Sequence, residues 1–585
     1  MTAENTTLPG GSQEERARTR RTLAIAFAAA LAVRAGAAWF CGAAQPQEIR
    51  YITIARGIAS GQGFVGLDNR YPDIIQPPLY PLILSWVFRL PGPELGLARG
   101  VSALMGALMV FTGAGMARRL FGERAARRTA WLVAVYPLLS HMSGAAITES
   151  TFTLLVTCAV LVLWRSLDAE VPPGKGLPLA ASGALLGLSF LTRPEGLTYL
   201  GAAALVAVVS GLARQRAVSS RLQAAAIRSL WLAGGFLVVA FPYLAWVRIE
   251  TGRWLLAPKA VLVQVHHELI QEGQRENWKE PYGSPLFFEH VRFGLNREST
   301  AIRSREIFAN VSVGMASGVL GSEEGDPSLF EPTMAIRMVL RNFQGVYLET
   351  IKDGFVVPTL LLMLFGVGLI SRPWVGPFRT SALVVFSFFA ASFSFLLSHV
   401  ESRFLFPAIP YVLPWIAEGW RRAELWAVAS VSGSGAARAA LRERAARLVV
   451  GAAVLGATIV HLIPQVQVAS KRWAEHREMG LWLRETAGAG HLIMAVTPGT
   501  AYYAEGRYEV LPFADLPEVV AYARHHGVEY VVADRAEIPS LRPQLTSLLV
   551  PARSHPGLDL VVARNERTPR AIILYRVAPP LDPAR

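Results

Sequence analysis

The sequence predicts a polytopic all-α membrane protein with a small α/β domain at its C-terminal end, and three observations lead to this fold class. Apolar side chains make up 52% of the 585 residues, and charged side chains only 17%. The mean hydropathy is +0.34, which is too apolar for an ordinary soluble chain of this size. Apolar runs recur up to residue 463, and beyond Pro464 they give way to short strand-like segments.

Apolar runs that could cross a bilayer follow one another along the first part of the chain. With spans of about 20 residues as the template, we expect about eleven helices. Their approximate extents are 23–41, 95–117, 129–143, 150–164, 177–191, 197–212, 230–247, 355–369, 381–398, 404–420 and 448–463. An odd number places the N-terminus in the cytoplasm and the C-terminus outside the cytoplasmic (inner) membrane.

The formal net charge of +14 comes from arginines that gather in short segments between the apolar runs. These segments hold Arg16, Arg18, Arg20 and Arg21; Arg118, Arg119, Arg124, Arg127 and Arg128; Arg214, Arg216, Arg221 and Arg228; and Arg438, Arg442, Arg444 and Arg447. Counting runs, all of them fall on one side, as the positive-inside rule requires. The charge therefore reflects membrane topology, and no nucleic-acid partner is expected.

The order of the runs divides the chain into three parts. Residues 1–22 form a basic cytoplasmic N-terminus, and the run after it is an uncleaved signal-anchor. Residues 23–464 form the transmembrane domain, with long outer loops at 42–94 and 250–353, and residues 465–585 form a periplasmic or extracytoplasmic α/β domain. The two cysteines, Cys41 and Cys158, lie in apolar runs and offer neither a disulfide framework nor a zinc spacing.

Two regions outside the spans have readable patterns. In the first outer loop, PPLYPLILSWVFRLPG is apolar for only about a dozen residues, too short to span, so we expect an interfacial or re-entrant helix. In the C-terminal part, HLIMAVTP, YVVAD and LVVARNERTPRAIILYRV indicate strands, the last a possible hairpin. LPEVVAYARHHG indicates an amphipathic helix ended by glycine.

Ionisable residues cluster at the ends of several expected spans. Such residues are costly near a bilayer, so they are functional candidates by default. The clusters, all on the expected outer side, are Glu48 and Arg50 after the first run; Glu149 in AAITESTF; Arg193 and Glu195 in LTRPEG; Arg253 and Lys259 in ETGRWLLAPKA; and His399, Glu401 and Arg403 in SHVESRFLFPAIP. Because their flanks are short or apolar, we expect them to form one site at the outer membrane surface.

In their order along the chain, these motifs resemble the polyprenyl-phosphate-sugar-dependent glycosyltransferases of the GT-C fold. That superfamily includes the protein O-mannosyltransferases (glycosyltransferase family 39) and the bacterial lipid A aminoarabinose transferases. The motifs are EIRYITIARGIASGQGF, QPPLYPLIL, ITEST, LTRPEG, TGRWLLAPKA and HVESRFLFPAIPYVL, and the resemblance covers roughly residues 23–463.

One position departs from the family pattern. The family carries an acidic residue four places before the tyrosine that matches Tyr51, often followed by a second acid. Here Gln47 stands at the first place, and only Glu48 is acidic. Either Glu48 serves instead, another carboxylate does (Glu149, Asp68 or Asp73), or the chain is a weak or altered transferase.

The resemblance implies transfer of a sugar from a polyprenyl phosphate to a hydroxyl of a lipid, glycan or protein in the cell envelope, as in protein glycosylation or lipid A modification. A carboxylate must accept the proton of that hydroxyl, first Glu48 and second Glu149. Fixed cations must face the leaving phosphate. Their candidates, in order, are Arg403, Lys259, Arg253 and Arg193, and the rest of the expected substrate-binding set is Arg50, Tyr51, Glu195, His399 and Glu401.

The same resemblance implies that no cofactor is required, because the donor already carries an activated sugar. The prenyl tail needs an apolar groove reached from the bilayer. A divalent metal held by Glu48 and a second acid is an alternative, but no ligand spacing in the sequence supports it.

Each candidate also has a purely structural interpretation. Glu48 and Glu149 can each interact with the dipole at the first turn of a helix. Arg193 and Glu195 can pair with each other across the proline turn. Contacts with lipid headgroups or with the interface are the structural interpretation of Arg50, Tyr51 and Lys259.

Two other functional classes stay open. A secondary transporter would carry ionisable residues near the bilayer midplane, in broken helices of two related halves. A non-catalytic envelope-assembly protein would leave the charges dispersed and would bind through its C-terminal domain. Charges that converge on one cavity favour the transferase.

Overall fold

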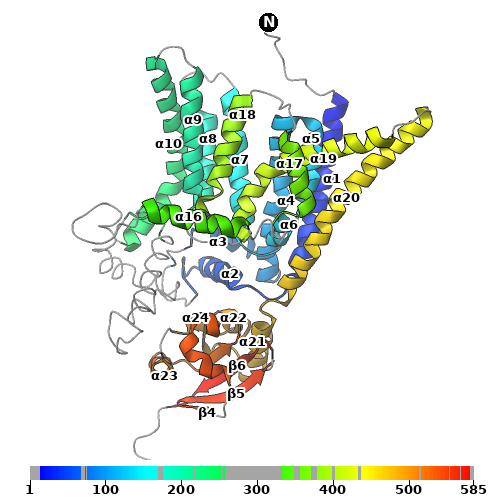
Figure 1. Ribbon diagram of the computed structural model, residues 1–585. Helices are drawn as coiled ribbons and strands as arrows, with labels where there is room; N and C mark the ends of the chain where they lie inside the picture. Colours follow the sequence, from blue (N-terminus) through cyan, green and yellow to red (C-terminus); the bar gives the residue numbers. More distant parts are fainter. Residues whose placement is uncertain are drawn as a thin grey trace, which may run out of the picture. The chain divides into compact units, whose positions relative to one another are not determined.

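The computed structural model describes residues 13–67, 73, 76–168, 176–214, 218–251, 254–256, 258, 332–347, 356–370, 378–397, 402–431, 436–512, 515–551, 554–566 and 568–579 (Figure 1). The chain separates into two compact units. The helical unit comprises Met1–Cys41, Ala98–Tyr243 and Gly325–Val468, and the mixed unit comprises Gly42–Leu97, Leu244–Glu324 and Ala469–Arg585.

The described part of the helical unit is built from helices alone. They are α1 (Gln13–Phe40), α4 (Glu94–Phe121), α5 (Glu123–Val135), α6 (Pro137–Met142), α7 (Glu149–Asp168), α8 (Leu177–Phe190), α9 (Gly196–Arg214), α10 (Val218–Thr251), α16 (Pro332–Tyr347), α17 (Thr359–Ile370), α18 (Phe378–Ala391), the 3₁₀ segments η4 (Ser394–Leu397) and η5 (Ser402–Ala408), α19 (Ile409–Val431) and α20 (Ala436–Lys471). Every apolar run that predicts a span coincides with one or two of these segments.

Length and composition identify the membrane helices among the described residues. Five helical stretches are long and apolar enough to cross a bilayer, namely α1, α4, α7, most of α10 and the stretch that contains the apolar part of α20. Four shorter apolar helices accompany them: α8, α9, α17 and α18. The protein is therefore a polytopic, mostly helical membrane protein, as the sequence predicts.

The third expected span is broken in two, and a buried arginine stabilises the break. Pro137 begins α6 and has no N–H group, so the carbonyl of Val133 loses its usual helical donor. Arg34 of α1, whose side chain is fully buried, donates to the carbonyls of Val133 (2.8 Å) and Ala134 (3.0 Å). An unpaired carbonyl in a membrane interior is costly, so the guanidinium makes the break tolerable.

Helices α8 and α10 approach each other closely at glycine residues. A Cβ atom at Gly235 of α10 would lie 2.0 Å from the Ala180 carbonyl oxygen, and one at Gly183 of α8 would lie 2.0 Å from the Leu232 carbonyl oxygen. Small residues permit such close backbone approach between membrane helices. The adjacent Gly234 has nothing within 4 Å of its Cβ direction.

We predict that Gly235→Ala destabilises the protein although alanine is the better helix former. The added methyl group must push α8 and α10 apart, which should cost about 1–3 kcal/mol. Gly234→Ala is the matched control and should be neutral or stabilising by up to about 1 kcal/mol. Thermal unfolding in detergent measures both, and equal melting temperatures for the two variants would contradict the close packing.

The mixed unit contains helices from residues 42–94 and all six described strands. Its elements are α2 (Pro46–Ala59), α3 (Leu79–Val87), α21 (Ala474–Ala487), β1 (Leu492–Ala495), α22 (Gly499–Tyr503), β2 (Arg507–Val510), α23 (Leu516–His525), β3 (Tyr530–Asp534), α24 (Ile538–Leu541), η6 (Pro543–Leu549), β4 (Ser554–His555), β5 (Leu558–Arg564) and β6 (Ile572–Val577). Helix α3 has 9 residues, about 14 Å, and cannot span a bilayer.

The six strands form one sheet in the order β2-β1-β3-β6-β5-β4. The first three strands are parallel, as expected for strands joined through α22 and α23, and β5 and β6 form the expected antiparallel hairpin. Successive side chains of β1 enter different apolar clusters: Leu492 and Met494 one, Ile493 and Ala495 the other. Both faces of β1 are therefore covered.

Three polar side chains are buried together at the carboxyl ends of β1 and β3. His476 of α21 lies with Nδ1 2.9 Å from the Thr500 hydroxyl and with Nε2 3.9 Å from Asp534 Oδ2. His476 and Asp534 are each 1% exposed. Burial lowers the pKa of His476 to about 4 and raises the pKa of Asp534 to about 7, where nearby Glu537 and Glu475 also favour the protonated acid.

These two pKa shifts have opposite effects on stability as the pH changes. The raised pKa of Asp534 lets the folded state bind a proton that the unfolded acid releases, so this group loses stabilisation as the pH rises from about 4 to 7. The lowered pKa of His476 makes the unfolded state the better proton acceptor, so this group loses stabilisation as the pH falls from about 6.5 to 4. Near pH 5 the folded state carries its proton on Asp534 and the unfolded state carries one on His476. The two states therefore bind equal numbers of protons, and the two effects on stability cancel.

We predict that removing either partner exposes the pH dependence of the other. Asp534→Asn should lose stability when the pH falls from 6.5 to 4.5, and His476→Gln should lose stability when the pH rises from 4.5 to 7. Each change should be on the order of 1–3 kcal/mol. Pulse proteolysis of the full chain, followed on a C-terminal tag, measures the stability at each pH. If the stability of both variants changed with pH in the same direction, the opposite pKa shifts of His476 and Asp534 would be contradicted.

Candidate functional site

The turn between α8 and α9 positions two candidate residues. Its sequence is LTRPEG, in which Pro194 cannot continue the helix and Gly196 starts α9. A Cβ atom at Gly196 would lie 2.5 Å from the Phe190 backbone nitrogen, so only glycine fits this tight approach. The turn places Arg193 and Glu195 together: Arg193 Nη2 lies 2.9 Å from Glu195 Oε1.

Glu149 is the first residue of α7, and its side chain contacts Arg193. Its Oε1 accepts a hydrogen bond from Arg193 Nη1 at 2.7 Å, and the whole residue is 2% exposed. Its Oε2 accepts no hydrogen bond from the residues that the structure describes. A buried carboxylate oxygen without such a bond is unusual and marks the position as a functional candidate.

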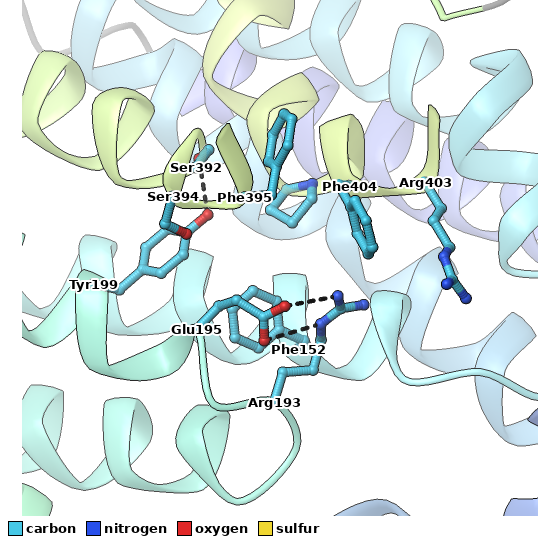
Figure 2. A pocket seen from close by; sticks show the side chains of 10 residues that line it. Phe152, Arg193, Glu195, Tyr199, Ser392, Ser394, Phe395, Arg403 and Phe404 are labelled. Atoms are coloured by element: carbon cyan, nitrogen blue, oxygen red, sulfur yellow. Dashed lines mark hydrogen bonds and ion pairs between the residues drawn. The ribbon is translucent and has the colours of Figure 1, made fainter. Parts of the chain in front are cut away.

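Arg403 reaches the same region from a distant part of the chain. It lies in η5, and its guanidinium carbon is 5.1 Å from the centre of the Phe404 ring, while that of Arg193 is 5.6 Å from the same ring. Figure 2 shows Phe404 between the two arginines. Cations over an aromatic face are stabilised by the ring quadrupole.

A small pocket unites these side chains. Arg193, Glu195 and Arg403 line it, together with residues that the sequence analysis does not single out: Phe152, Tyr199, Ser392, Ser394, Phe395, Phe404 and Pro407 (Figure 2). Tyr199 donates a hydrogen bond to the Ser392 hydroxyl at 2.8 Å. Tyr199 lies in the first turn of α9, four residues after Glu195, and this spacing is a signal that could have identified it. No comparable pattern marks Ser392 or Ser394.

Arg193 has two acidic partners at the edge of the pocket. Arg193 contacts both Glu149 and Glu195, so its positive charge is more than offset by its two acidic partners. A phosphate would add a third anion to that arginine. Arg193 is thus better suited to hold the two carboxylates in place than to bind an anion.

A second group of candidates lies together in the mixed unit, on α2. Glu48 is fully buried, and its Oε2 accepts the backbone N–H of Gln45 at 2.8 Å, so it caps its own helix. Arg50 Nε donates to Asp73 Oδ2 at 2.9 Å, and the Tyr51 hydroxyl donates to Gln76 Oε1 at 3.2 Å. Glu48 therefore caps the start of α2, and this structural role is compatible with a catalytic one.

The remaining candidates fall outside the described residues. They are Arg253, Lys259, His399 and Glu401, together with the alternative acid Asp68. The structure thus brings together Glu149, Arg193, Glu195 and Arg403 in one unit, and Glu48, Arg50 and Tyr51 in the other. Within the described part of the chain, no group of three or more His, Cys, Asp or Glu side chains is placed to hold a metal ion.

The comparisons with known proteins agree on one architecture. Residues 75–246 match the family model described as dolichyl-phosphate-mannose-protein mannosyltransferase. The chain is similar to ArnT from Cupriavidus metallidurans, solved with bound undecaprenyl phosphate: 17% identity over 95% of this chain and 99% of that one, with a TM-score of 0.50. It is also similar to the oligosaccharyltransferase of Archaeoglobus fulgidus, solved with a tethered acceptor peptide: 15% identity over 88% of this chain and 69% of that one, with a TM-score of 0.52.

The protein has the GT-C fold. In sequence, the chain matches none of the curated proteins with which it was compared. The part of this GT-C chain that matches the family model contains α7 and the α8–α9 turn, and therefore Glu149, Arg193 and Glu195.

We predict that the two acids beside Arg193 in this GT-C protein differ in their effect on stability. Glu149→Gln removes the almost fully buried charge partner of the largely buried Arg193 and should cost about 3 kcal/mol. The Glu195 side chain is 35% exposed, so Glu195→Gln should cost at most about 1 kcal/mol. Thermal unfolding of both variants in detergent is the measurement, and a larger loss for Glu195→Gln would show that Glu149 is not the principal partner.

Proposed function

We propose that this GT-C protein is an integral membrane glycosyltransferase that moves a sugar from a polyprenyl phosphate to a hydroxyl acceptor at the outer face of the cytoplasmic membrane. The fold supports the class of enzyme, and the family model matched by residues 75–246 describes a mannosyltransferase that uses a lipid-linked donor. The similar ArnT structure holds undecaprenyl phosphate, and the similar oligosaccharyltransferase holds an acceptor peptide.

The observation that carries the proposal is the convergence of charges from three separate segments. Glu149 begins α7, Arg193 and Glu195 lie in the α8–α9 turn, and Arg403 lies in η5, about 250 residues later in the chain than Glu149. Acids and bases from distant segments that meet around one pocket are typical of a catalytic site. Charged groups stabilise a transition state most strongly where water is excluded.

The chemistry assigns a different role to each kind of residue. The acceptor hydroxyl attacks the anomeric carbon, the bond from that carbon to the phosphate oxygen breaks, and the electron pair leaves with the phosphate. A carboxylate, Glu48 first and Glu149 second, accepts the hydroxyl proton. Arg403, with Lys259 and Arg253, faces the charge that grows on the phosphate. Arg193 acts through the acids that it holds.

The location of the charges also weighs against the transporter hypothesis. Glu149 begins a helix, and Arg193 and Glu195 lie in a turn between two helices. A transporter would be expected to place ionisable groups within broken helices near the membrane midplane. The break between α5 and α6 carries instead a guanidinium whose contacts are with backbone carbonyls, so it has the features of a structural element.

The activity is tested directly with the purified full chain in proteoliposomes. Polyprenyl-phosphate-linked hexoses and pentoses are supplied as donors, and released polyprenyl phosphate is measured by mass spectrometry. We expect release with at least one donor, increased by an extract that contains envelope acceptors. No release with any donor, together with an unchanged set of envelope glycans after deletion, would refute the transferase.

Substitutions in the active protein then test the roles. We predict that Glu48→Gln lowers kcat by about 10²-fold or more if this carboxylate is the general base. Arg403→Gln should lower kcat by about 10²- to 10³-fold through lost stabilisation of the leaving phosphate. Arg89→Gln is the control, because Arg89 lies over the Trp86 ring outside both candidate groups. Equal losses for Arg403→Gln and the control would remove Arg403 from the site.

A further inference from the structure

Helix α22 of the C-terminal sheet region contacts the start of α2 within the mixed unit. The backbone N–H of Ala44 donates to the Tyr503 hydroxyl at 2.6 Å. The same contact is supported by an apolar cluster in which Ala44 and Ile49 pack with Ala501, Ala504 and Met479. Segments about 450 residues apart in sequence thus share one core.

The residue that Tyr503 binds lies immediately before the N-cap of α2. Gln45 is that cap: its side chain accepts the N–H of Glu48, and its own N–H donates to Glu48 Oε2 at 2.8 Å. Pro46 follows and fixes the backbone at the first helical position. The position of the Glu48 carboxylate therefore depends on Ala44 and Gln45, the residues that Tyr503 and the cap hold.

Helix α22 is itself firmly placed. Thr500, in its first turn, lies 2.9 Å from His476 Nδ1, and both residues are buried. The Tyr502 and Tyr503 rings meet edge to face with centroids 5.2 Å apart. A short helix anchored to the core at one end can transmit that rigidity to whatever its other end contacts.

We infer that Tyr503 is a positioning residue, through which the C-terminal α/β region holds the start of α2 and the Glu48 carboxylate in their working geometry. This inference rests on the proposed function, in which Glu48 is the general base. A displacement of about 1 Å in a catalytic group can cost on the order of 10²-fold in rate, so a hydroxyl remote from the substrate can still control turnover.

The test removes the hydroxyl alone. Tyr503→Phe keeps the ring and its packing but leaves the Ala44 N–H without its acceptor. Tyr508→Phe is the matched control, because Tyr508 belongs to the same apolar cluster but its hydroxyl donates to the Val496 carbonyl. We expect Tyr503→Phe to lower kcat by about 10- to 100-fold with little change in KM, and Tyr508→Phe to leave kcat within about twofold.

A double substitution separates positioning from general damage. If Tyr503 acts through Glu48, then Tyr503→Phe should have little further effect in a Glu48→Gln background. Additive losses would overturn the inference, because they would show that the hydroxyl acts independently of Glu48.

A second readout does not depend on activity. Hydrogen–deuterium exchange of the full-length Tyr503→Phe variant should rise at residues 44–49 and stay unchanged in α3. No change at residues 44–49 would overturn the inference. If the wild-type protein transferred no sugar while exchange still rose in the variant, the proposed function would fail, and with it the catalytic role of Glu48, whereas the contact between α22 and α2 would stand.

Discussion

The structure depends on one constraint: polar groups placed in a membrane interior must find partners inside the protein. Arg34 meets it at the broken third span, where a proline has removed a backbone donor and the guanidinium supplies two N–H groups instead. Gly183 and Gly235 are a second consequence of the membrane environment. Helices in lipid associate through close packing rather than through the hydrophobic effect, and these glycines permit that packing. Both features lie in the helical unit, and the glycine contact involves α8, the helix that leads into the turn with Arg193 and Glu195.

The same constraint shapes the site. Arg193 is largely buried and has two carboxylates beside it, one almost fully buried and one partly exposed. A buried charge needs such compensation, and here the compensation also orders two acids beside a pocket that contains a second arginine and several aromatic rings. The members of this network lie at helix ends, where side chains can reach one another without breaking the backbone hydrogen bonds of a span. Under the proposed function, the same network would serve both stability and chemistry.

The mixed unit is stabilised differently, because its sheet has apolar clusters on both faces, as in a soluble α/β domain. In its sheet, β2 pairs with one edge of β1 and β3 with the other, so the strand order changes direction at β1. His476, Thr500 and Asp534 are buried at the carboxyl ends of β1 and β3, close to this point. The helix that carries Thr500 also carries Tyr503, whose hydroxyl reaches the start of α2. Polar residues in this unit thus connect the sheet with the helix on which the candidate general base Glu48 lies.

The sequence by itself determined the fold class, the location of the apolar helices, the short α3 and the β5–β6 hairpin, because hydrophobic periodicity and length are local properties of the chain. It also identified Glu149, Arg193, Glu195 and Arg403 as candidates, although not their division of labour. Only the tertiary structure decided that Arg193 is enclosed by two acids, that Pro137 breaks a span which Arg34 repairs, and that Tyr503 contacts Ala44. Each of these is a contact between residues far apart in sequence, and no local pattern specifies which distant partner a polar side chain will meet.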